Sequence, residues 1–237
     1  MVRWVDPMLH HPALGHVRWL GGGTGAGKTA ITARLADAFG LRTYSTDAAI
    51  RPHGLVPGPD TPLLSAFSGM NMDERWVRRT PQTMLETFPW FRGERFDSIV
   101  TDLVGQPRTP MMIAEGFRLL PRLVHPLLDE SWHAVWLIST PGFRRRVFER
   151  RPPADQFWLR TSDPALAFER LLERDERFAQ QVADEAVGLG LKVFLVDGTT
   201  PEADLAAEVA HWLRLPAPPH LAGDSYRRSI LHRALAE

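Results

Sequence analysis

A glycine-rich segment near the start of the chain determines the fold that we expect. Residues 22–29 read Gly-Gly-Thr-Gly-Ala-Gly-Lys-Thr. The alternating apolar residues of 16–20 come directly before it and predict a β-strand, whereas the apolar spacing of 28–39 predicts an α-helix that ends at Gly40. A strand, a glycine turn and a helix in this order are typical of a parallel α/β sheet.

The same eight residues fit the phosphate-binding pattern G-x-x-x-x-G-K-[ST]. Glycines let the backbone curl so that its N–H groups point at phosphate oxygens, and the next helix presents its N-terminus to the same anion. In this pattern Lys28 reaches the β- and γ-phosphates and the Thr29 hydroxyl binds Mg²⁺. We therefore expect a site for MgATP at Gly22, Gly23, Thr24, Gly25, Ala26, Gly27, Lys28 and Thr29. The other interpretation is a glycine-rich turn that fits the pattern by chance.

The use of lysine in this chain supports a working phosphate site. Lysine and arginine together number 28, yet the only lysines are Lys28 and Lys192. Nearly every other position that needs a cation holds arginine. Lys28 stands where phosphate binding requires a compact ammonium on a flexible stem, so its position favours function.

Apolar runs along the rest of the chain predict four more strands. The five predicted strands are residues 16–20, 41–45, 110–114, 134–138 and 192–196. The predicted helices are 28–39, 73–90 with interruptions at its prolines, 92–104, 118–128, 142–151, 164–188 and 201–213, and 51–60 is a predicted loop. Strands that alternate with helices predict a three-layer α/β/α fold around a five-stranded parallel sheet.

We expect one domain over residues 1–215 and a tail without an assignable role over 216–237. The chain has no cysteine, which excludes a disulfide framework, a zinc–thiolate site and a cysteine nucleophile. Acidic and basic residues number 28 each, so nothing indicates a nucleic-acid or membrane partner. No segment approaches the roughly 18 apolar residues of a membrane-spanning helix, and the expected location is the cytoplasm.

Missing signatures narrow the class of nucleotide-binding protein. A GTPase of the usual kind reads guanine with an Asn-Lys-x-Asp segment, but the only asparagine, Asn71, is followed by Met72 and Asp73. The Leu-Ser-Gly-Gly-Gln signature of transporter ATPases does not occur either. The expected nucleotide is therefore ATP.

Together with three later features, the phosphate loop resembles that of the small-molecule P-loop kinases. These are the nucleoside-monophosphate kinase, shikimate kinase and chloramphenicol phosphotransferase-like group. The later features are Asp47 after the second predicted strand, Glu115-Gly116-Phe117-Arg118 after the third, and an arginine-rich segment after the fourth. The second of these is similar to the Asp-Gly-Phe-Pro-Arg stretch of adenylate kinases, with Glu115 in place of aspartate and no proline before Arg118.

The resemblance implies a kinase that moves the γ-phosphoryl group of ATP to a small hydroxyl- or phosphate-bearing molecule. Asp47 would orient or deprotonate the acceptor, and Glu115 would hold Mg²⁺ through water or polarise the acceptor. Lys28 and Arg118 would belong to the same catalytic group. Without such a site, Asp47 is a helix N-cap and Glu115 an ordinary acid at a strand end. Strand ends face the ligand crevice of such a sheet, which favours function for both acids.

Five arginines within eight residues are expected to form a lid over residues 142–160. They are Arg144, Arg145, Arg146, Arg150 and Arg151. Like charges so close together repel one another unless an anion is near, and lid arginines can neutralise a phosphoryl group during transfer. Arg146 and Arg150 are the catalytic candidates. The other interpretation is a solvated helix face whose charge Glu149 partly neutralises.

Residues 51–108 are expected to form a helical cap over the substrate. Aromatic residues lie among arginines there, which suits stacking on a ring and binding an anion. They are Trp76, Phe88, Trp90, Phe91 and Phe96. Core packing of inserted helices explains the pattern equally well. An alternative function is a regulatory ATPase or switch that acts on a protein partner through residues 51–108 or the tail.

Overall fold

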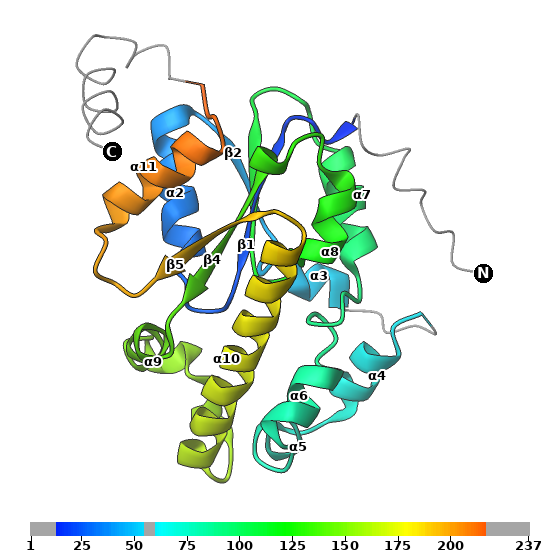
Figure 1. Cartoon of the computed structure of the whole chain (residues 1–237). Helices are drawn as coiled ribbons and strands as arrows, with labels where there is room; N and C mark the ends of the chain where they lie inside the picture. The colour runs from blue at the N-terminus through cyan, green and yellow to red at the C-terminus, as the bar shows by residue number, and fades with distance from the viewer. Residues whose placement is uncertain (1–12, 55–59, 217–237) are drawn as a thin grey trace.

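A five-stranded parallel sheet runs through the middle of the protein (Figure 1). The computed structural model describes residues 13–54 and 60–216. The strands are β1 (Val17–Gly22), β2 (Arg42–Ser45), β3 (Met112–Glu115), β4 (Ala134–Ser139) and β5 (Lys192–Val196). Their order in the sheet is β2-β3-β1-β4-β5, and every neighbouring pair is parallel. The predicted fold class and the five predicted strands are therefore confirmed.

Helices cover both faces of this sheet (Figure 1). On one face, α2 (Lys28–Phe39) packs beside α11 (Glu202–Trp212). On the other face lie α7 (Phe96–Val104), α8 (Pro121–Val124) and the long α10 (Pro164–Gly188). Every residue of β1, β3 and β4 is buried as a result, which explains why β3 and β4 read as nearly continuous apolar runs.

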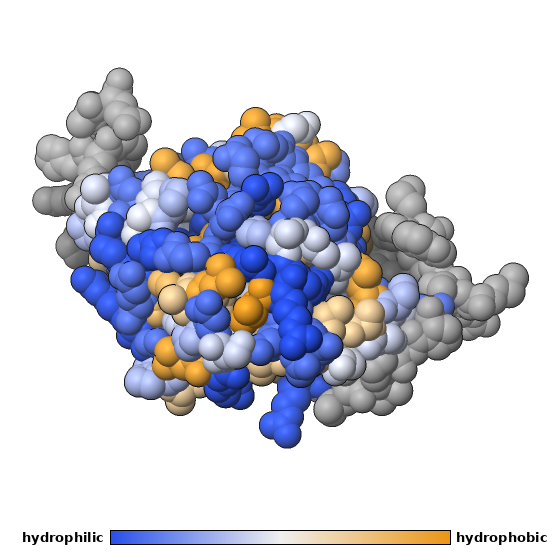
Figure 2. All heavy atoms as spheres, turned by 90° about the horizontal axis from the view of Figure 1, so that it is seen from below, coloured by the Kyte–Doolittle hydropathy of each residue, from blue (hydrophilic) through white to orange (hydrophobic). Residues whose placement is uncertain are grey.

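The strand order changes direction at β1. The chain places β2 and β3 on one side of β1, and β4 and β5 on the other. Ligands of open α/β sheets bind beyond the carboxyl ends of the strands at such a point. The register pairs Leu20 with Glu115 and Gly22 with Leu137, so the ends of β1 and β3 meet at one edge. Figure 2 views this end and shows apolar residues exposed within a largely hydrophilic surface.

Short helices replace the two long ones that were predicted between β2 and β3. Besides α7, they are α3 (Ile50–Gly54), α4 (Pro62–Gly69), α5 (Met72–Trp76) and α6 (Pro81–Thr87). The predicted helix 73–90 is interrupted at Pro81, as expected from the sequence, because Pro81 starts the first turn of α6. The N–H group that proline lacks has no partner within a helix at that position. The Thr80 hydroxyl caps this new start by accepting a hydrogen bond from the N–H of Thr83.

Helix α4 lies where no element was predicted. The carboxylate of Glu94 accepts hydrogen bonds from the N–H groups of Leu63 and Leu64, at 2.9 and 2.7 Å. This cap comes from a residue 30 positions along the chain, so local spacing does not reveal it. The predicted loop 51–60 is also partly wrong, because α3 continues to Gly54. Residues 55–59 lie outside the described residues.

Two other predicted helices start later than expected. The prediction of a helix over 118–128 is wrong for its first turn, because α8 begins only at Pro121 and gives way to the 3-10 turn η2 (His125–Leu127). A residue before proline avoids the helical region, and Leu120 is accordingly extended. Helix α7 begins at Phe96 rather than at Arg92 and packs on the sheet, so the cap proper consists of α4, α5 and α6.

The segment after β4 contains α9 (Pro141–Glu149) followed by two 3-10 turns, η4 (Pro153–Asp155) and η5 (Phe157–Arg160), while η3 (Ser131–His133) precedes β4. Residues 217–237, which form nearly all of the expected tail, lie outside the described residues. Within the two described ranges, no helix combines the length and apolar character needed to cross a membrane.

A substitution of Trp136 would measure how much a buried hydrogen bond in the sheet contributes to stability. Its ring is fully buried, and Nε1 donates a hydrogen bond of 2.8 Å to the carbonyl oxygen of Leu119. Trp136→Phe should lower the free energy of unfolding by about 2–3 kcal/mol, because it leaves both a void and an unpaired buried carbonyl. Urea unfolding followed by circular dichroism measures this change.

The matched control is Trp212→Phe. Trp212 makes the same kind of hydrogen bond, 3.0 Å to the carbonyl of Ala134, but it is only partly buried. A partly exposed ring leaves a smaller buried void when it is shortened, so the loss should be about half as large or less. If both variants lose the same free energy of unfolding, the burial of Trp136 does not explain its contribution to stability.

Candidate functional site

The glycine-rich segment forms a curled loop between β1 and α2. Gly22, Gly25 and Gly27 have φ angles of 130°, 69° and 78°, a region that favours glycine. A Cβ atom at Gly22 would lie 2.0 Å from the carbonyl oxygen of Leu137 on β4. Helix α2 begins directly after Gly27, so the N–H groups of its first turn face the loop. This backbone shape suits an anion.

Lys28 is turned back into the loop and buried. Its Nζ donates a hydrogen bond of 2.6 Å to the carbonyl oxygen of Gly23. Burial lowers the pKa of this ammonium, whereas the nearby carboxylates of Asp47, Glu115 and Asp175 favour its charged form. The cation is therefore positioned at the mouth of the anion cradle by the loop itself.

Glu115 lies at the end of β3, beside the start of α2. Its Oε1 accepts a hydrogen bond from the Thr29 hydroxyl at 3.3 Å, and its Oε2 is buried with no hydrogen-bond partner among the described residues. Burial raises the pKa of the Glu115 carboxyl, although the Ser45 hydroxyl and the Lys28 ammonium oppose the rise. A buried carboxylate oxygen without a partner indicates a missing cation or donor.

This pair of oxygens fits a magnesium ion. Mg²⁺ prefers oxygen ligands and is usually held by one or two protein groups, with phosphate oxygens and water completing the shell. No group of three metal-ligating side chains occurs in the described ranges. The carboxylate of Glu115 and the hydroxyl of Thr29 would therefore be the protein's contribution.

Asp47 follows β2 and faces the same cavity as Lys28 and Thr29. Its carboxylate is exposed, and Oδ1 accepts a weak hydrogen bond from the Thr46 hydroxyl at 3.4 Å. Gly116 makes room for this turn: a Cβ atom there would lie 1.8 Å from the hydroxyl oxygen of Thr46. The structure thus brings together the two acids that follow β2 and β3.

Arg118 lies behind the site rather than in it. It is almost fully buried, and burial lowers its pKa to about 10. One guanidinium nitrogen donates to the carbonyl oxygen of Thr46 and to Nδ1 of His53, at 3.1 and 3.2 Å, and another donates to the carbonyl of Arg95 at 3.0 Å. Arg118 does not line the cavity, so its geometry supports a role in positioning the loop that carries Asp47.

The five clustered arginines point in different directions around α9. Arg144 is buried against the phosphate loop and donates to the carbonyls of Ser139 and Thr24. Arg145 pairs with Glu169, and Arg146 donates to the carbonyl of Asp197. Arg150 is exposed.

Of these five arginines, Arg151 alone lines the cavity, with its guanidinium 3.9 Å from the ring centre of Phe148. The structure therefore does not bring the candidates Arg146 and Arg150 to the site. Because Arg144 and Phe148 fix α9 to the phosphate loop, the lid-like part of the segment is η4 and η5, which carries Phe157 and Arg160 to the cavity.

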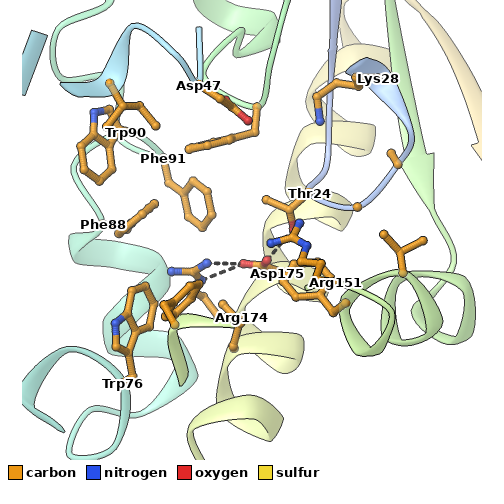
Figure 3. Close-up of a pocket in the computed structure, with 18 of the residues that line it drawn as sticks. Thr24, Lys28, Asp47, Trp76, Phe88, Trp90, Phe91, Arg151, Arg174 and Asp175 are labelled. Carbon is orange, nitrogen blue, oxygen red and sulfur yellow. Dashed lines mark hydrogen bonds and ion pairs between the residues drawn. The ribbon is translucent and has the colours of Figure 1, made fainter. Parts of the chain in front are cut away.

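A cavity of about 640 Å³ opens beside the phosphate loop (Figure 3). Lys28, Thr29 and Asp47 lie on one side of it. Aromatic side chains form the other side, and these are Phe67, Trp76, Phe88, Trp90, Phe91 and Phe117. Most of them also pack edge to face against one another. The aromatic side chains of this segment therefore both line the cavity and form a packed core of the inserted helices. Phe96 is the exception, because it packs against the core instead.

Sequence reasoning missed an ion pair on α10. Arg174 and Asp175 have side chains that are only 5% and 1% exposed. Nε and Nη2 of Arg174 donate to Oδ1 of Asp175, and Oδ2 of Asp175 accepts a hydrogen bond from Thr24 of the phosphate loop. Both residues fall at helical spacing on the apolar stripe of α10, between Leu171 and Phe178. Two charges on a buried stripe were the signal that could have revealed them.

Glu115→Gln should stabilise the ligand-free protein at neutral pH. The amide can still accept the hydrogen bond from Thr29, but it removes a buried charge. Because the pKa of Glu115 is raised, the folded protein holds this proton more tightly than the unfolded chain. The wild type should therefore lose stability relative to the variant as pH rises from the ordinary glutamate pKa through the raised one.

Urea unfolding at several values between about pH 4 and pH 8 measures this difference. Glu208→Gln, at an exposed position of α11, is the control and should show no such trend. If the wild type stays as stable as Glu115→Gln across this range, the charge of the buried carboxylate does not lower the free energy of unfolding.

Comparisons with known proteins add little to this geometry. No protein-family model matches the chain, and no curated protein does. Among solved structures, the chain is similar to a shikimate kinase from Acinetobacter baumannii in complex with shikimate. That match has 15% sequence identity and a TM-score of 0.43, and it covers 86% of this chain and 97% of the other. A likeness this distant gives no evidence on activity, so the functional argument below depends on the site itself.

Proposed function

We propose that this protein is an ATP-dependent phosphotransferase that moves the γ-phosphoryl group of MgATP to a hydroxyl group of a small molecule. The observation that supports it most is the position of Glu115. Its unpartnered carboxylate oxygen is buried beside Thr29 and the phosphate loop, next to a cavity that also contains Asp47. A phosphate site and a candidate acid or base thus line one cavity, and a candidate metal ligand is hydrogen-bonded to Thr29 in its wall.

The phosphate loop would bind the nucleotide mainly through its backbone. The curl at Gly22, Gly25 and Gly27 directs N–H groups towards the β- and γ-phosphates, and Lys28 exchanges its bond to Gly23 for phosphate oxygens. Thr29 and Glu115 would hold Mg²⁺, which neutralises charge on the two phosphates when it is bound. ATP is the proposed nucleotide because the guanine-reading segment is absent from the sequence.

Asp47 would act on the acceptor. The acceptor oxygen attacks the γ-phosphorus, and a new P–O bond forms while the bond to the oxygen that bridges the β- and γ-phosphates breaks. ADP leaves with that electron pair, and the acceptor proton passes to the Asp47 carboxylate, which is exposed in the cavity. Most of the rate enhancement would come from orientation and from fixed charges.

Arg151 would supply the charge that was expected of Arg146 and Arg150. It is the member of the arginine cluster that lines the cavity, and it is close enough to Lys28 to affect the pKa of that ammonium. Arg118 is proposed to position the turn at Asp47 through the Thr46 carbonyl. A cavity beside the phosphate loop favours a small acceptor over a protein partner, so the kinase is preferred to the regulatory switch.

Lys28→Met should lower phosphoryl transfer by roughly 10²–10³-fold or more and weaken ATP binding, because it removes the cation that contacts the transferring group. The matched control is Lys192→Met, which removes the chain's other lysine. Lys192 is on β5 and lies over the rings of Phe194 and Trp212, away from the loop. Calorimetric titration with ATP and a coupled assay for ADP release measure the two effects.

Equal losses in the two lysine variants, or unchanged ATP affinity in Lys28→Met, would remove the basis for a nucleotide site. The same assay separates a kinase from a switch. ADP release should rise sharply with one member of a panel of small hydroxylated compounds, whereas stimulation by a protein alone would favour the switch.

Asp47→Asn should reduce turnover by roughly 10²–10⁴-fold with little change in ATP affinity, since the amide keeps the size of the side chain but cannot accept the acceptor proton. Asp37→Asn, at an exposed position on α2, is the control and should leave turnover unchanged. Steady-state kinetics at saturating ATP measure this. Wild-type turnover in Asp47→Asn would leave Asp47 without its proposed role.

A further inference from the structure

Arg174 is a buried cation with one donor left over. Its Nε and Nη2 are bound to Asp175, but Nη1 is buried and donates no hydrogen bond within the described ranges. A buried donor without a partner costs about 1–3 kcal/mol, and more when it is charged. Arg174 also lines the cavity beside the phosphate loop. Its guanidinium, with one N–H group not yet used, therefore forms part of the cavity wall.

Aromatic rings surround this guanidinium. Its central carbon lies 4.9, 4.6 and 5.0 Å from the ring centres of Trp76, Phe88 and Phe91 (Figure 3). Ring faces attract cations, so these contacts help to keep the charge in an apolar part of the cavity. Asp175 fixes the guanidinium from the other side and is itself bound to Thr24. The donor is thus held in one place before any ligand arrives.

Apart from Arg174, the polar side chains that the cap and the turn η5 add to the cavity lining are the cations Arg75 and Arg160. The described lining includes no serine, asparagine, glutamine, histidine or tyrosine side chain. A sugar or a nucleobase displays several donors and acceptors, and each one buried without a partner costs about 1–3 kcal/mol. A flat apolar ring meets no such cost and gains contact with the aromatic side chains.

The unpartnered polar groups here are both donors. In addition to Arg174, the indole Nε1 of Trp90 is buried without a hydrogen-bond partner among the described residues, and Trp90 lines the same cavity. A ligand that satisfies these two N–H donors must present acceptor atoms, such as oxygens, to them. An arginine N–H group binds an anionic oxygen more strongly than a neutral one.

We propose that the phosphoryl acceptor is an aromatic hydroxy acid. Its ring lies between the aromatic side chains of the cap, its carboxylate accepts a hydrogen bond from Nη1 of Arg174, and its hydroxyl group points to Asp47 and the phosphate loop. The position of the hydroxyl group rests on the phosphotransferase function proposed above. Binding of the ring and the carboxylate does not, and it can be measured without nucleotide.

The first test compares probes on the wild-type protein by calorimetric titration. The probe acid is 6-hydroxy-2-naphthoate, and its neutral counterpart of equal shape is 6-hydroxy-2-naphthamide. The acid should bind at least about tenfold more tightly than the amide, as expected for a charge-assisted bond, and more tightly than quinate, a polyhydroxy acid without an aromatic ring, or AMP. Equal binding of acid and amide, tighter binding of quinate or AMP, or no binding of the acid would overturn the proposal.

The second test assigns the anion to Arg174. Arg174→Gln should lower the affinity for the acid at least about tenfold and leave that for the amide nearly unchanged, because only the acid loses an ionic partner. Arg177→Gln is the control, since Arg177 lies on the same helix but is exposed and paired with Glu173. An equal loss for acid and amide in Arg174→Gln would show a structural role only. The wild-type comparison stands even if this variant does not fold.

Lys28→Met separates this inference from the proposed activity. That variant should still bind the acid, because Lys28 is on the nucleotide side of the cavity, while its phosphoryl transfer is lost. If the acid binds through Arg174 but the wild type never phosphorylates it, the acceptor assignment fails and the anion site remains. If another class of compound is phosphorylated and the acid does not bind, the phosphotransferase stands and the inference fails.

Discussion

The site depends on charges that are buried together at one edge of the sheet. Lys28, Glu115, Arg144, Arg174 and Asp175 are all less than 10% exposed, and each charge is expensive to bury alone. Their mutual contacts and their bonds to the loop backbone compensate for most of this cost. The exceptions are single atoms of Glu115 and Arg174 that have no partner in the described ranges. Those atoms mark the two places where a ligand would complete the structure, one for a cation and one for an anion.

The sheet was predictable because its information is local. Strands β3 and β4 are buried on both faces, so each appears as an apolar run, and β1 is marked by the fixed pattern of Gly22 to Thr29 that follows it. The cap was not predictable, because contacts between distant residues determine it. Glu94 caps α4 from 30 residues away, and Arg118 lies in a turn, bound to the carbonyl of Thr46, where a helix was predicted. No window of neighbouring residues contains either contact.

The same division applies to the site. The proximity of Asp47 and Glu115 was predictable because parallel strands end at one edge of the sheet, whatever the loops between them do. Arg146 and Arg150 were misleading because neighbours in a helix are rotated by about 100° from one another, so a run of arginines cannot all face one cavity. Arg151 comes after the end of α9 and does reach it. Arg174 and Asp175 could have been identified in another way, because two charged residues on an otherwise apolar helix face indicate a buried ion pair.

The hydrogen bond between Thr24 and Asp175 joins the two halves of the cavity. Asp175 shares one oxygen with the phosphate loop and the other with Arg174, so any shift of the loop on binding the proposed nucleotide would change the contacts that hold the guanidinium. Linkage then requires the reverse effect of equal size, because a free energy of coupling between two ligands belongs to neither of them alone. Through the carboxylate of Asp175, the affinity for each of the two proposed ligands would therefore depend on whether the other is bound.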